Sequence, residues 1–284
     1  MPNAYVTVDV LKSNGVLPSS SPDNDVRYRQ LSEGVSRQID GFLHRHVFAR
    51  SGTLYFSGDG DKTLLTPDLV SVSTLLEDSN GDGTFDTGWA AADYHTAPFN
   101  ASPTDEWNAR PYTSLVVNEA STGTQDVFER GQRNYRISGT WGYSGVTVDT
   151  GLNTSAVVST AATSVTLDGT VDGVIEVGHT VLLGTEQMYV TNVATGGTSI
   201  NVQRAVNGPA TGSHGAAASV SIYVYPEPIR EAAIGQVSRL FKRGQAGWVS
   251  EIGLPETGVV QVMSPRGRLD PDVKALVGPF RRLR

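Results

Sequence analysis

The strongest constraint on the fold is an apolar stripe that runs through residues 26–47. Its members recur every three to five residues, which places them on one face of an α-helix of about six turns. They are Val26, Leu31, Val35, Ile39, Phe42, Leu43 and Val47. Asp23 or Asn24 can cap this helix, because a short oxygen side chain accepts hydrogen bonds from the amides of the first turn. The sequence therefore predicts a long N-terminal helix that faces a core.

Two further helices are predicted near the other end of the sequence. The first begins at Pro226-Glu227-Pro228 and carries an apolar stripe along residues 228–243. The second is short, with Asp270 as its cap and Pro271 in its first position. Residues 1–22 show no such pattern, so we expect an extended N-terminal arm that docks elsewhere or stays mobile.

Between the helices the pattern changes to short strands. Residues 51–117 hold apolar runs separated by turns rich in Gly, Asp and Pro. The stretch Tyr135–Tyr143, Y-R-I-S-G-T-W-G-Y, begins as a half-buried strand, and Gly139 and Gly142 allow the backbone to turn beside Trp141. Residues 149–222 are almost uncharged, rich in Thr, Val, Ala and Gly, and contain four regularly spaced strand patterns. This composition is typical of a small β-sandwich or barrel inserted into another module.

Together these patterns predict an α+β fold. Its small helical core would consist of the long N-terminal helix, the second helix near 228–243 and the short C-terminal helix, accompanied by β-strand segments. An all-β domain would be inserted into this core. The expected division is an arm at 1–22, a core at 23–148 and 224–284, and an inserted β domain at 149–223.

Composition narrows the classes of function. The 284 residues can form two domains or one large β-rich domain. The formal net charge of −7 argues against a general nucleic-acid binder with a basic surface. The absence of cysteine excludes disulfides and thiolate metal sites. The N-terminus has no secretory signal pattern, and no apolar run approaches the roughly 20 residues of a membrane-spanning helix. We expect a soluble protein that is made in a cytoplasm.

One loop resembles the front of a calcium-binding loop. Asp78, Asn80, Asp82 and Asp86 place oxygen side chains at relative positions 1, 3, 5 and 9, with glycine at position 6. Position 12, where a bidentate glutamate belongs, is Trp89, and no helical pattern flanks the loop. The alternative is a tight turn in which the carboxylates bond to their own backbone.

The search for catalytic residues points away from an enzyme. No phosphate-binding glycine loop, zinc-binding histidine motif or nucleophile motif is present, and no cofactor is expected. The basic residues near the C-terminus can contact a partner or DNA phosphates, although such charges are more often solvated. They are Arg239, Lys242, Arg243, Arg281, Arg282 and Arg284.

The order of several motifs resembles a known family. After the N-terminal helix come Leu69-Val70-Ser71-Val72, the Asp78–Asp86 turn, Trp89, Asp93-Tyr94, Pro98-Phe99-Asn100 and Pro111-Tyr112. Ser138-Gly139-Thr140-Trp141-Gly142-Tyr143, the helix 228–243 and Leu269-Asp270-Pro271-Asp272-Val273 follow. Over about residues 24–143 and 225–284 the sequence resembles the head–tail connector (adaptor) proteins of long-tailed bacteriophages. The β insertion lies outside the resemblance.

The resemblance implies a structural virion protein of the phage neck, assembled in the host cytoplasm. Such connectors form an oligomeric ring, commonly of twelve copies, beneath the portal protein. The ring extends the DNA channel and docks the tail-completion (stopper) protein, and DNA passes through it without sequence-specific binding. The first and second helices would pack together in the ring wall.

Two other functions remain open at this point. The chain could be another tail or baseplate protein whose β insertion binds carbohydrate or decorates the particle, with Tyr189 and Tyr223 as its available aromatic residues. It could also be a calcium-dependent or hydrolytic surface protein, which would depend on the Asp78–Asp86 loop.

Overall fold

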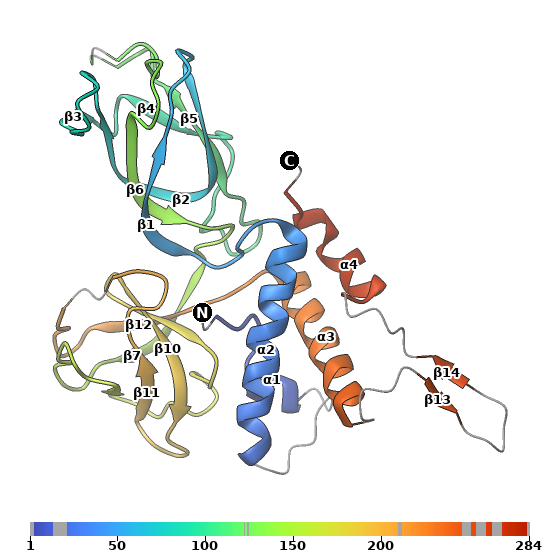
Figure 1. The fold of residues 1–284 in the computed structure, drawn as a ribbon. Coiled ribbons are helices and arrows are strands. Elements are labelled where there is room, and N and C mark those ends of the chain that lie inside the picture. Colours follow the sequence, from blue (N-terminus) through green and yellow to red (C-terminus); the bar gives the residue numbers. More distant parts are fainter. Residues whose placement is uncertain are drawn as a thin grey trace.

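The computed structural model describes residues 3–13, 22–121, 123, 125–209, 212–245, 251–253, 260–262 and 269–282. This part of the chain consists of four helices and two six-stranded antiparallel sheets, with a separate two-stranded ribbon (Figure 1). In Figure 1 the two sheets lie one above the other, to the left of α3 and α4. Among the described helices, none has the length and apolar character needed to cross a membrane.

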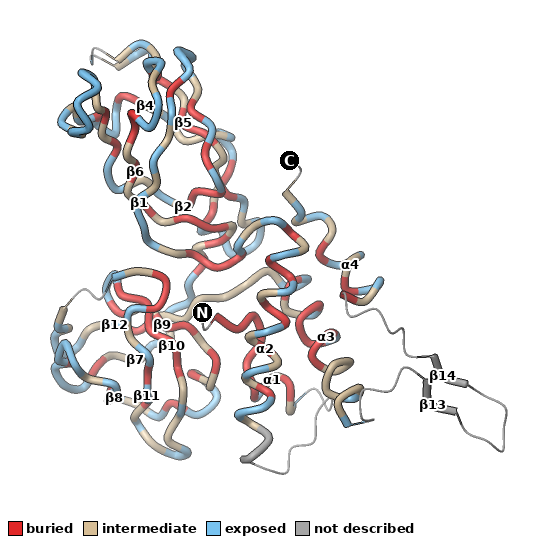
Figure 2. Tube along the Cα trace, in the orientation of Figure 1, coloured by how far each residue is buried: buried red, intermediate tan, exposed pale blue. Residues whose placement is uncertain are grey.

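The helices share one apolar core. They are α1 (Val8–Ser13), α2 (Pro22–Leu43), α3 (Glu227–Gln245) and α4 (Pro271–Val277), followed by the 3-10 turn η1 (Gly278–Phe280). α2 and α3 lie side by side, and their facing sides are buried (Figures 1 and 2). Val35 and Ile39 of α2 belong to the same buried cluster as Val237 of α3. The rings of Tyr28 and Phe241 meet edge to face with centroids 5.1 Å apart. The expected packing of the first long helix on the second is confirmed.

The helix ends follow local chemistry. Asp270 caps α4, because its side chain accepts a hydrogen bond from the Asp272 amide at 3.1 Å, and Pro271 occupies the first position as predicted. α2 ends earlier than its apolar pattern does, since His44 adopts a left-handed backbone (φ 56°). Val47 lies beyond the helix and still packs in the helical core.

Residues 3–13 do not form an extended arm. Tyr5, Val6, Val8 and Leu11 are buried in the helical core. The Ser32 hydroxyl donates to the Val6 carbonyl at 2.6 Å, so this segment is held directly on α2. The residues that contact this segment are distant from it in the sequence. The local pattern of residues 3–13 therefore could not predict that the segment is buried.

The first sheet is built from residues 50–141. Its strands are β1 (Arg50–Phe56), β2 (Thr63–Glu77), β3 (Thr87–Trp89), β4 (Tyr94–Ala97), β5 (Tyr112–Val117) and β6 (Tyr135–Trp141). The order is β1-β6-β2-β5-β4, with β3 paired to the end of β2. Its core contains Trp89, stacked on Phe128 with centroids 4.7 Å apart, and Trp141, whose indole N–H donates to the Gly52 carbonyl. The bulk of Trp141 is therefore covered inside the sheet's own module.

The second sheet is built from residues 147–223. Its strands are β7 (Thr147–Asn153), β8 (Ser164–Thr166), β9 (Thr180–Leu183), β10 (Glu186–Val193), β11 (Ser199–Gln203) and β12 (Ser219–Tyr223), in the order β7-β12-β9-β10-β11-β8. Met188, Val190 and Ile200 lie in a separate apolar core. Within the described residues, β13 (Glu251–Gly253) and β14 (Val260–Val262) form a separate two-stranded antiparallel sheet.

The predicted fold class is wrong. The protein is mainly β, with two antiparallel sheets of six strands each, and is not a small helical core with one inserted β domain. The error lies in residues 50–141, where short runs were interpreted as strands that accompany the helices. β2 alone spans 15 residues and shifts register between Leu65 and Leu69, Leu69 and Ser71, and Val72 and Thr74. These irregularities break the two-residue alternation by which a strand is recognised.

A buried ion pair lies in the second sheet's module, at the first residue of β10. Glu186 is fully buried and accepts hydrogen bonds from Arg204 Nε at 2.9 Å and Arg204 Nη2 at 2.5 Å. His214 Nε2 lies 2.8 Å from the same carboxylate. Burial alone would raise the pKa of Glu186, but the hydrogen bonds from Arg204 and His214 outweigh it and lower the pKa to about 2.

A matched pair of substitutions tests the helical core. Val35→Ala removes a side chain that is 1% exposed, whereas Val26→Ala changes a residue of α2 that is 52% exposed. We expect Val35→Ala to lower the free energy of unfolding by about 1.5–3 kcal/mol and Val26→Ala to change it by less than about 0.5 kcal/mol. Chemical denaturation measures both values, and equal losses would contradict the assigned core face of α2.

The pH dependence of stability tests the Glu186 pair. Because its pKa of about 2 lies below the ordinary value of about 4.3, its stabilising contribution is present above that ordinary value. The contribution, about 3 kcal/mol, is lost as the pH falls toward the folded-state pKa. Glu186→Gln should therefore flatten the acid side of the stability curve measured by urea denaturation. Glu231→Gln, the same change at an exposed position of α3, serves as control, and an equally steep curve for Glu186→Gln would contradict the assignment.

Candidate functional site

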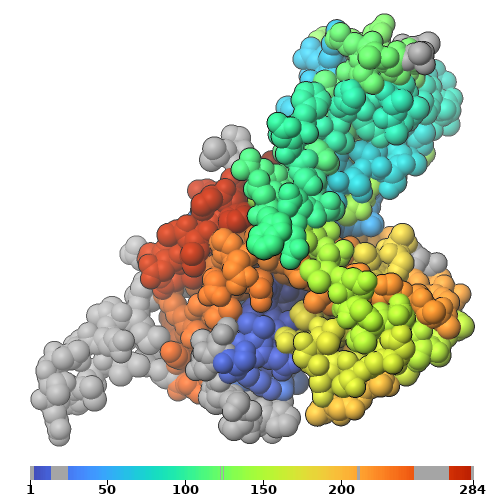
Figure 3. Space-filling model, turned by 180° about the vertical axis from the view of Figure 1, so that it is seen from behind, coloured from blue at the N-terminus to red at the C-terminus, as the bar shows by residue number. Residues whose placement is uncertain are grey.

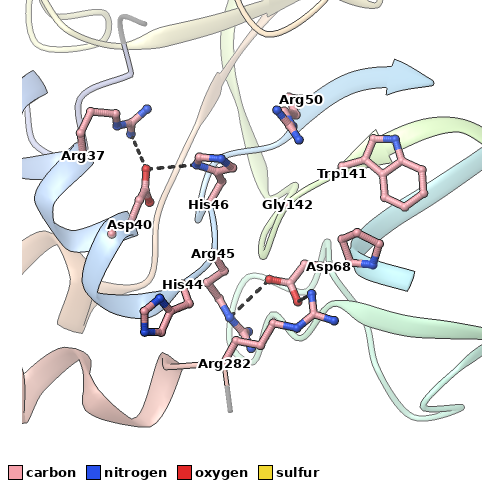
Figure 4. Close-up of a pocket in the computed structure, with 12 residues that line it drawn as sticks. Arg37, Asp40, His44, Arg45, His46, Arg50, Asp68, Trp141, Gly142 and Arg282 are labelled. Atoms are coloured by element: carbon pink, nitrogen blue, oxygen red, sulfur yellow. Dashed lines mark hydrogen bonds and ion pairs between the residues drawn. The ribbon is translucent and has the colours of Figure 1, made fainter. Parts of the chain in front are cut away.

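A hollow of about 450 Å³ lies where the end of α2 meets the first sheet and the C-terminal segment (Figure 4). We call it the junction pocket and define it by its charged side chains. These are Arg37, Asp40, Arg45, Arg50, Asp68 and Arg282, with His44 and His46 beside them. They come from α2 and its exit, β1, β2 and the residues after η1, so the pocket exists only in the folded chain.

Two glycines bring these elements together. Gly142 has a φ of 144°, and a Cβ there would lie 2.2 Å from the Phe48 carbonyl oxygen. Gly139 lies inside β6 and not in a turn, and a Cβ there would lie 2.2 Å from the Ser71 carbonyl oxygen of β2. Both positions therefore require glycine, because the backbones approach too closely for any side chain. These two glycines are the first and last residues of the G-T-W-G stretch in the sequence.

Asp40 collects contacts from three segments. Its Oδ1 accepts a short hydrogen bond from the Tyr5 hydroxyl and a second from the Val47 amide at 3.3 Å. Its Oδ2 pairs with Arg37 Nη2 at 3.1 Å and lies 3.4 Å from His46 Nδ1. Burial, followed by the nearby Asp40 charge, raises the pKa of Tyr5 well above its ordinary value, so this phenol stays a hydrogen-bond donor.

Asp68 holds the C-terminal segment. Its Oδ2 lies 3.3 Å from Arg45 Nε, and its Oδ1 lies 3.7 Å from Arg282 Nη1. Arg282 also donates from Nη2 to the Thr66 carbonyl and from its amide to the Leu43 carbonyl, both at 2.9 Å. Burial raises the pKa of Asp68 although Arg45 and Arg282 oppose the shift, and burial lowers the pKa of Arg45. The pocket thus joins β2, the exit of α2 and the chain after η1.

The loop that resembles a calcium-binding loop lies away from this pocket, between β2 and β3. Asp78 accepts hydrogen bonds from the amides of Gly81, Asp82 and Gly83 at 2.8–3.2 Å, and Asp82 accepts one from the Thr84 amide at 2.7 Å. Asn80 bonds within the same turn, and Asp86 contacts Thr87. Within the described residues, no group of three or more His, Cys, Asp or Glu side chains is placed to hold a metal. The geometry corresponds to the alternative interpretation, a tight turn whose carboxylates bond to their own backbone.

The predicted partner-binding residues do not form one patch. Arg239 pairs with Asp270 at 3.1 Å and so joins α3 to α4, and Arg282 is held in the junction pocket. Arg281 lies over the Phe42 ring and 3.3 Å from His44 Nε2. Lys242 is exposed and Arg243 is half-buried near the end of α3, while Arg284 lies outside the described residues.

The acidic residues of the pocket were missed because they looked like ordinary polar positions. In the sequence Asp40 is one of several charged residues between the apolar positions of the helix, and Asp68 follows Pro67 without a recognisable motif. The spacing of Arg37 and Asp40 by three positions was the one available signal, since side chains three apart meet on a helix.

An apolar groove of about 930 Å³ forms a second surface feature. It lies between residues 98–111 and the start of α3, with Pro228 and Phe280 on its opposite wall. Trp107 at this groove is 92% exposed, and the neighbouring Phe99 is 70% exposed. In Figure 3 the chain around residue 100 stands beside α3 and the C-terminal helix. We call this surface the 98–111 groove.

The Asp68 contacts predict a change in local opening. Asp68→Asn would leave Arg45 and Arg282 side by side without their shared negative charge. We expect the Arg282 amide, which bonds to Leu43, to exchange with solvent roughly five- to tenfold faster, corresponding to about 1 kcal/mol of local stability. Hydrogen–deuterium exchange of the C-terminal peptide measures this rate. Asp61→Asn, at an exposed position, is the control, and unchanged exchange in Asp68→Asn would contradict the proposed restraint.

Comparison with known proteins adds no assignment. No family model matches the sequence, and no curated protein matches it.

Proposed function

We propose that this protein is a head–tail connector (adaptor) of a tailed bacteriophage. In this role it forms a ring, of twelve copies as is common in the family, below the portal protein in the neck of the virion. The ring extends the DNA channel and presents a docking surface for the tail-completion protein. It is a structural protein and not an enzyme.

The observation that carries the proposal is the packing of α2 on α3. These helices lie on opposite sides of both sheets in the sequence, yet they share one buried cluster that also contains Val273 of α4. The resemblance covers residues 24–143 and 225–284, which are separated by the insertion. It therefore requires that these two segments pack on each other, as α2 and α3 do. The helical unit supplies a rigid body from which a ring wall can be built.

The motifs of the resemblance have structural roles at the joints of this body. Gly139 and Gly142 allow the close approaches beside the junction pocket, and Asp270 caps the helix that packs on α3. Motifs with such structural roles are expected in the same order in proteins that share a fold. The roles of these motifs therefore support a shared fold more strongly than similar composition alone would.

Exposed apolar side chains support assembly with other subunits. A closed ring needs two different complementary patches on each copy. Trp107 lines the 98–111 groove, whereas Leu65 of β2 (76% exposed) and Leu276 of α4 lie on other elements. Large exposed apolar residues of this kind are typical of protein–protein contact surfaces. The acidic total of the chain suits a channel through which DNA slides without adhering.

The carbohydrate-binding alternative gains no support from the second sheet. Tyr189 is 1% exposed and donates a hydrogen bond to Glu33 of α2 at 2.7 Å, and Tyr223 is half-buried. A sugar platform requires an exposed aromatic face, and Tyr189 instead joins this sheet to α2.

Electron microscopy of the purified full chain, alone and mixed with its portal protein, tests the proposal. We expect closed rings whose subunits each contain a helical body and two β modules. Trp107→Ser should reduce ring formation if the 98–111 groove is a subunit contact, whereas Val157→Ser, at another exposed apolar position (67% exposed), should leave it intact. A persistent monomer in the presence of portal protein would overturn the connector assignment.

A further inference from the structure

The junction pocket has more positive charge than its internal ion pairs require. Arg37, Arg45, Arg50 and Arg282 approach it from three segments of the chain, and Asp40 and Asp68 are the acidic residues that line it. Four arginines and two aspartates leave two positive charges, before His44 and His46 are counted. The surplus is notable because the whole chain carries a formal charge of −7.

Both aspartates already have cationic partners. Asp40 pairs with Arg37, and Asp68 lies between Arg45 and Arg282. Arg50, the first residue of β1, has no acidic partner within the described residues. It lies across the hollow from Arg45 and Arg282 (Figure 4). The internal network therefore accounts for three of the arginines and leaves Arg50 unexplained.

Two guanidinium groups in the wall have buried N–H groups without a hydrogen-bond acceptor. Nε and Nη1 of Arg37 are buried and have no hydrogen-bond acceptor in the described part of the chain. Nε of Arg45 is also buried, and its 3.3 Å contact with Asp68 lies outside hydrogen-bond geometry. Buried donors without acceptors are rare in folded proteins, and a bound ligand is one way to satisfy them.

We propose that the junction pocket binds a phosphate group, with Arg50 as its principal ligand. Guanidinium groups match phosphate oxygens with two parallel hydrogen bonds. Donors that converge from three directions suit a tetrahedral anion better than a planar carboxylate, which a single arginine can saturate. The two surplus charges match a phosphate dianion, and the hollow of about 450 Å³ is large enough to admit it. This site is additional to the connector role and does not depend on ring formation.

Titration calorimetry of the full chain with inorganic phosphate at neutral pH, against sodium chloride of equal ionic strength, tests the proposal. We expect saturable binding of phosphate and none of chloride. Arg50→Gln should bind phosphate about ten- to a hundredfold more weakly, because it loses a charge-assisted hydrogen-bond donor. Arg27→Gln removes the same charge from an exposed position of α2 outside the pocket and should bind like the wild type.

A second variant keeps the test decisive if Arg50→Gln folds poorly. Arg50→Lys retains the charge but loses the planar fork, so it should bind phosphate more weakly than the wild type and more tightly than Arg50→Gln. Absence of phosphate-specific binding in the wild type would overturn the proposal. Equal weakening in Arg27→Gln and Arg50→Gln would also overturn it, because that result indicates diffuse charge and not a site.

The source of the phosphate is decided by competition. A short duplex DNA is added to the protein before the phosphate titration. If DNA abolishes the heat of phosphate binding in the wild type but does not bind Arg50→Gln at this site, the site binds a backbone phosphate of DNA. If the heat of phosphate binding is unchanged, the site binds a free phosphate or a small phosphate ester.

Discussion

The structure depends on burial of the apolar stripe of α2 against α3. Val35 and Ile39 on one helix and Val237 on the other are removed from water together, and Tyr28 and Phe241 extend this contact with their rings. α1 also packs on α2 and α4 also packs on α3, and an amphipathic helix gains most of its stability from such packing. The first sheet follows α2 directly and the second sheet precedes α3, so both modules are joined in the chain to this helical pair.

Local patterns in the sequence predicted α2, α3 and α4, missed α1, and predicted the sheets incompletely. The three-to-five-residue spacing in α2, the proline at the start of α3 and the Asp270-Pro271 pair each act within a few residues, so they could be recognised without the fold. The size of the first sheet depends on which strands pair. β6 lies between β1 and β2, and this order is fixed by approaches such as that of Gly139 to Ser71, which no local pattern contains.

The candidate site could not be predicted from the sequence for the same reason. Asp40 and Asp68 are separated in the chain, and each looks like a solvated polar residue until its arginine partners are placed beside it. Arg282 was identified as a basic residue available to a partner, but its contacts with Asp68, Thr66 and Leu43 are internal. A charge in a sequence has no fixed role, because burial and neighbours determine whether it is solvated, paired or available to a ligand.

The separation of α2 from α3 also affects how the chain is made. A ribosome completes both sheets after α2 has been synthesised and before α3 exists, so for most of translation the stripe of α2 lacks the cover that α3 gives it. Contacts between distant segments form late, and apolar surface left open in the meantime attracts chaperones or other nascent chains. Each β module can close on its own interior during this delay. The helical body is therefore finished last, so subunits cannot begin to associate through it until synthesis has passed α3.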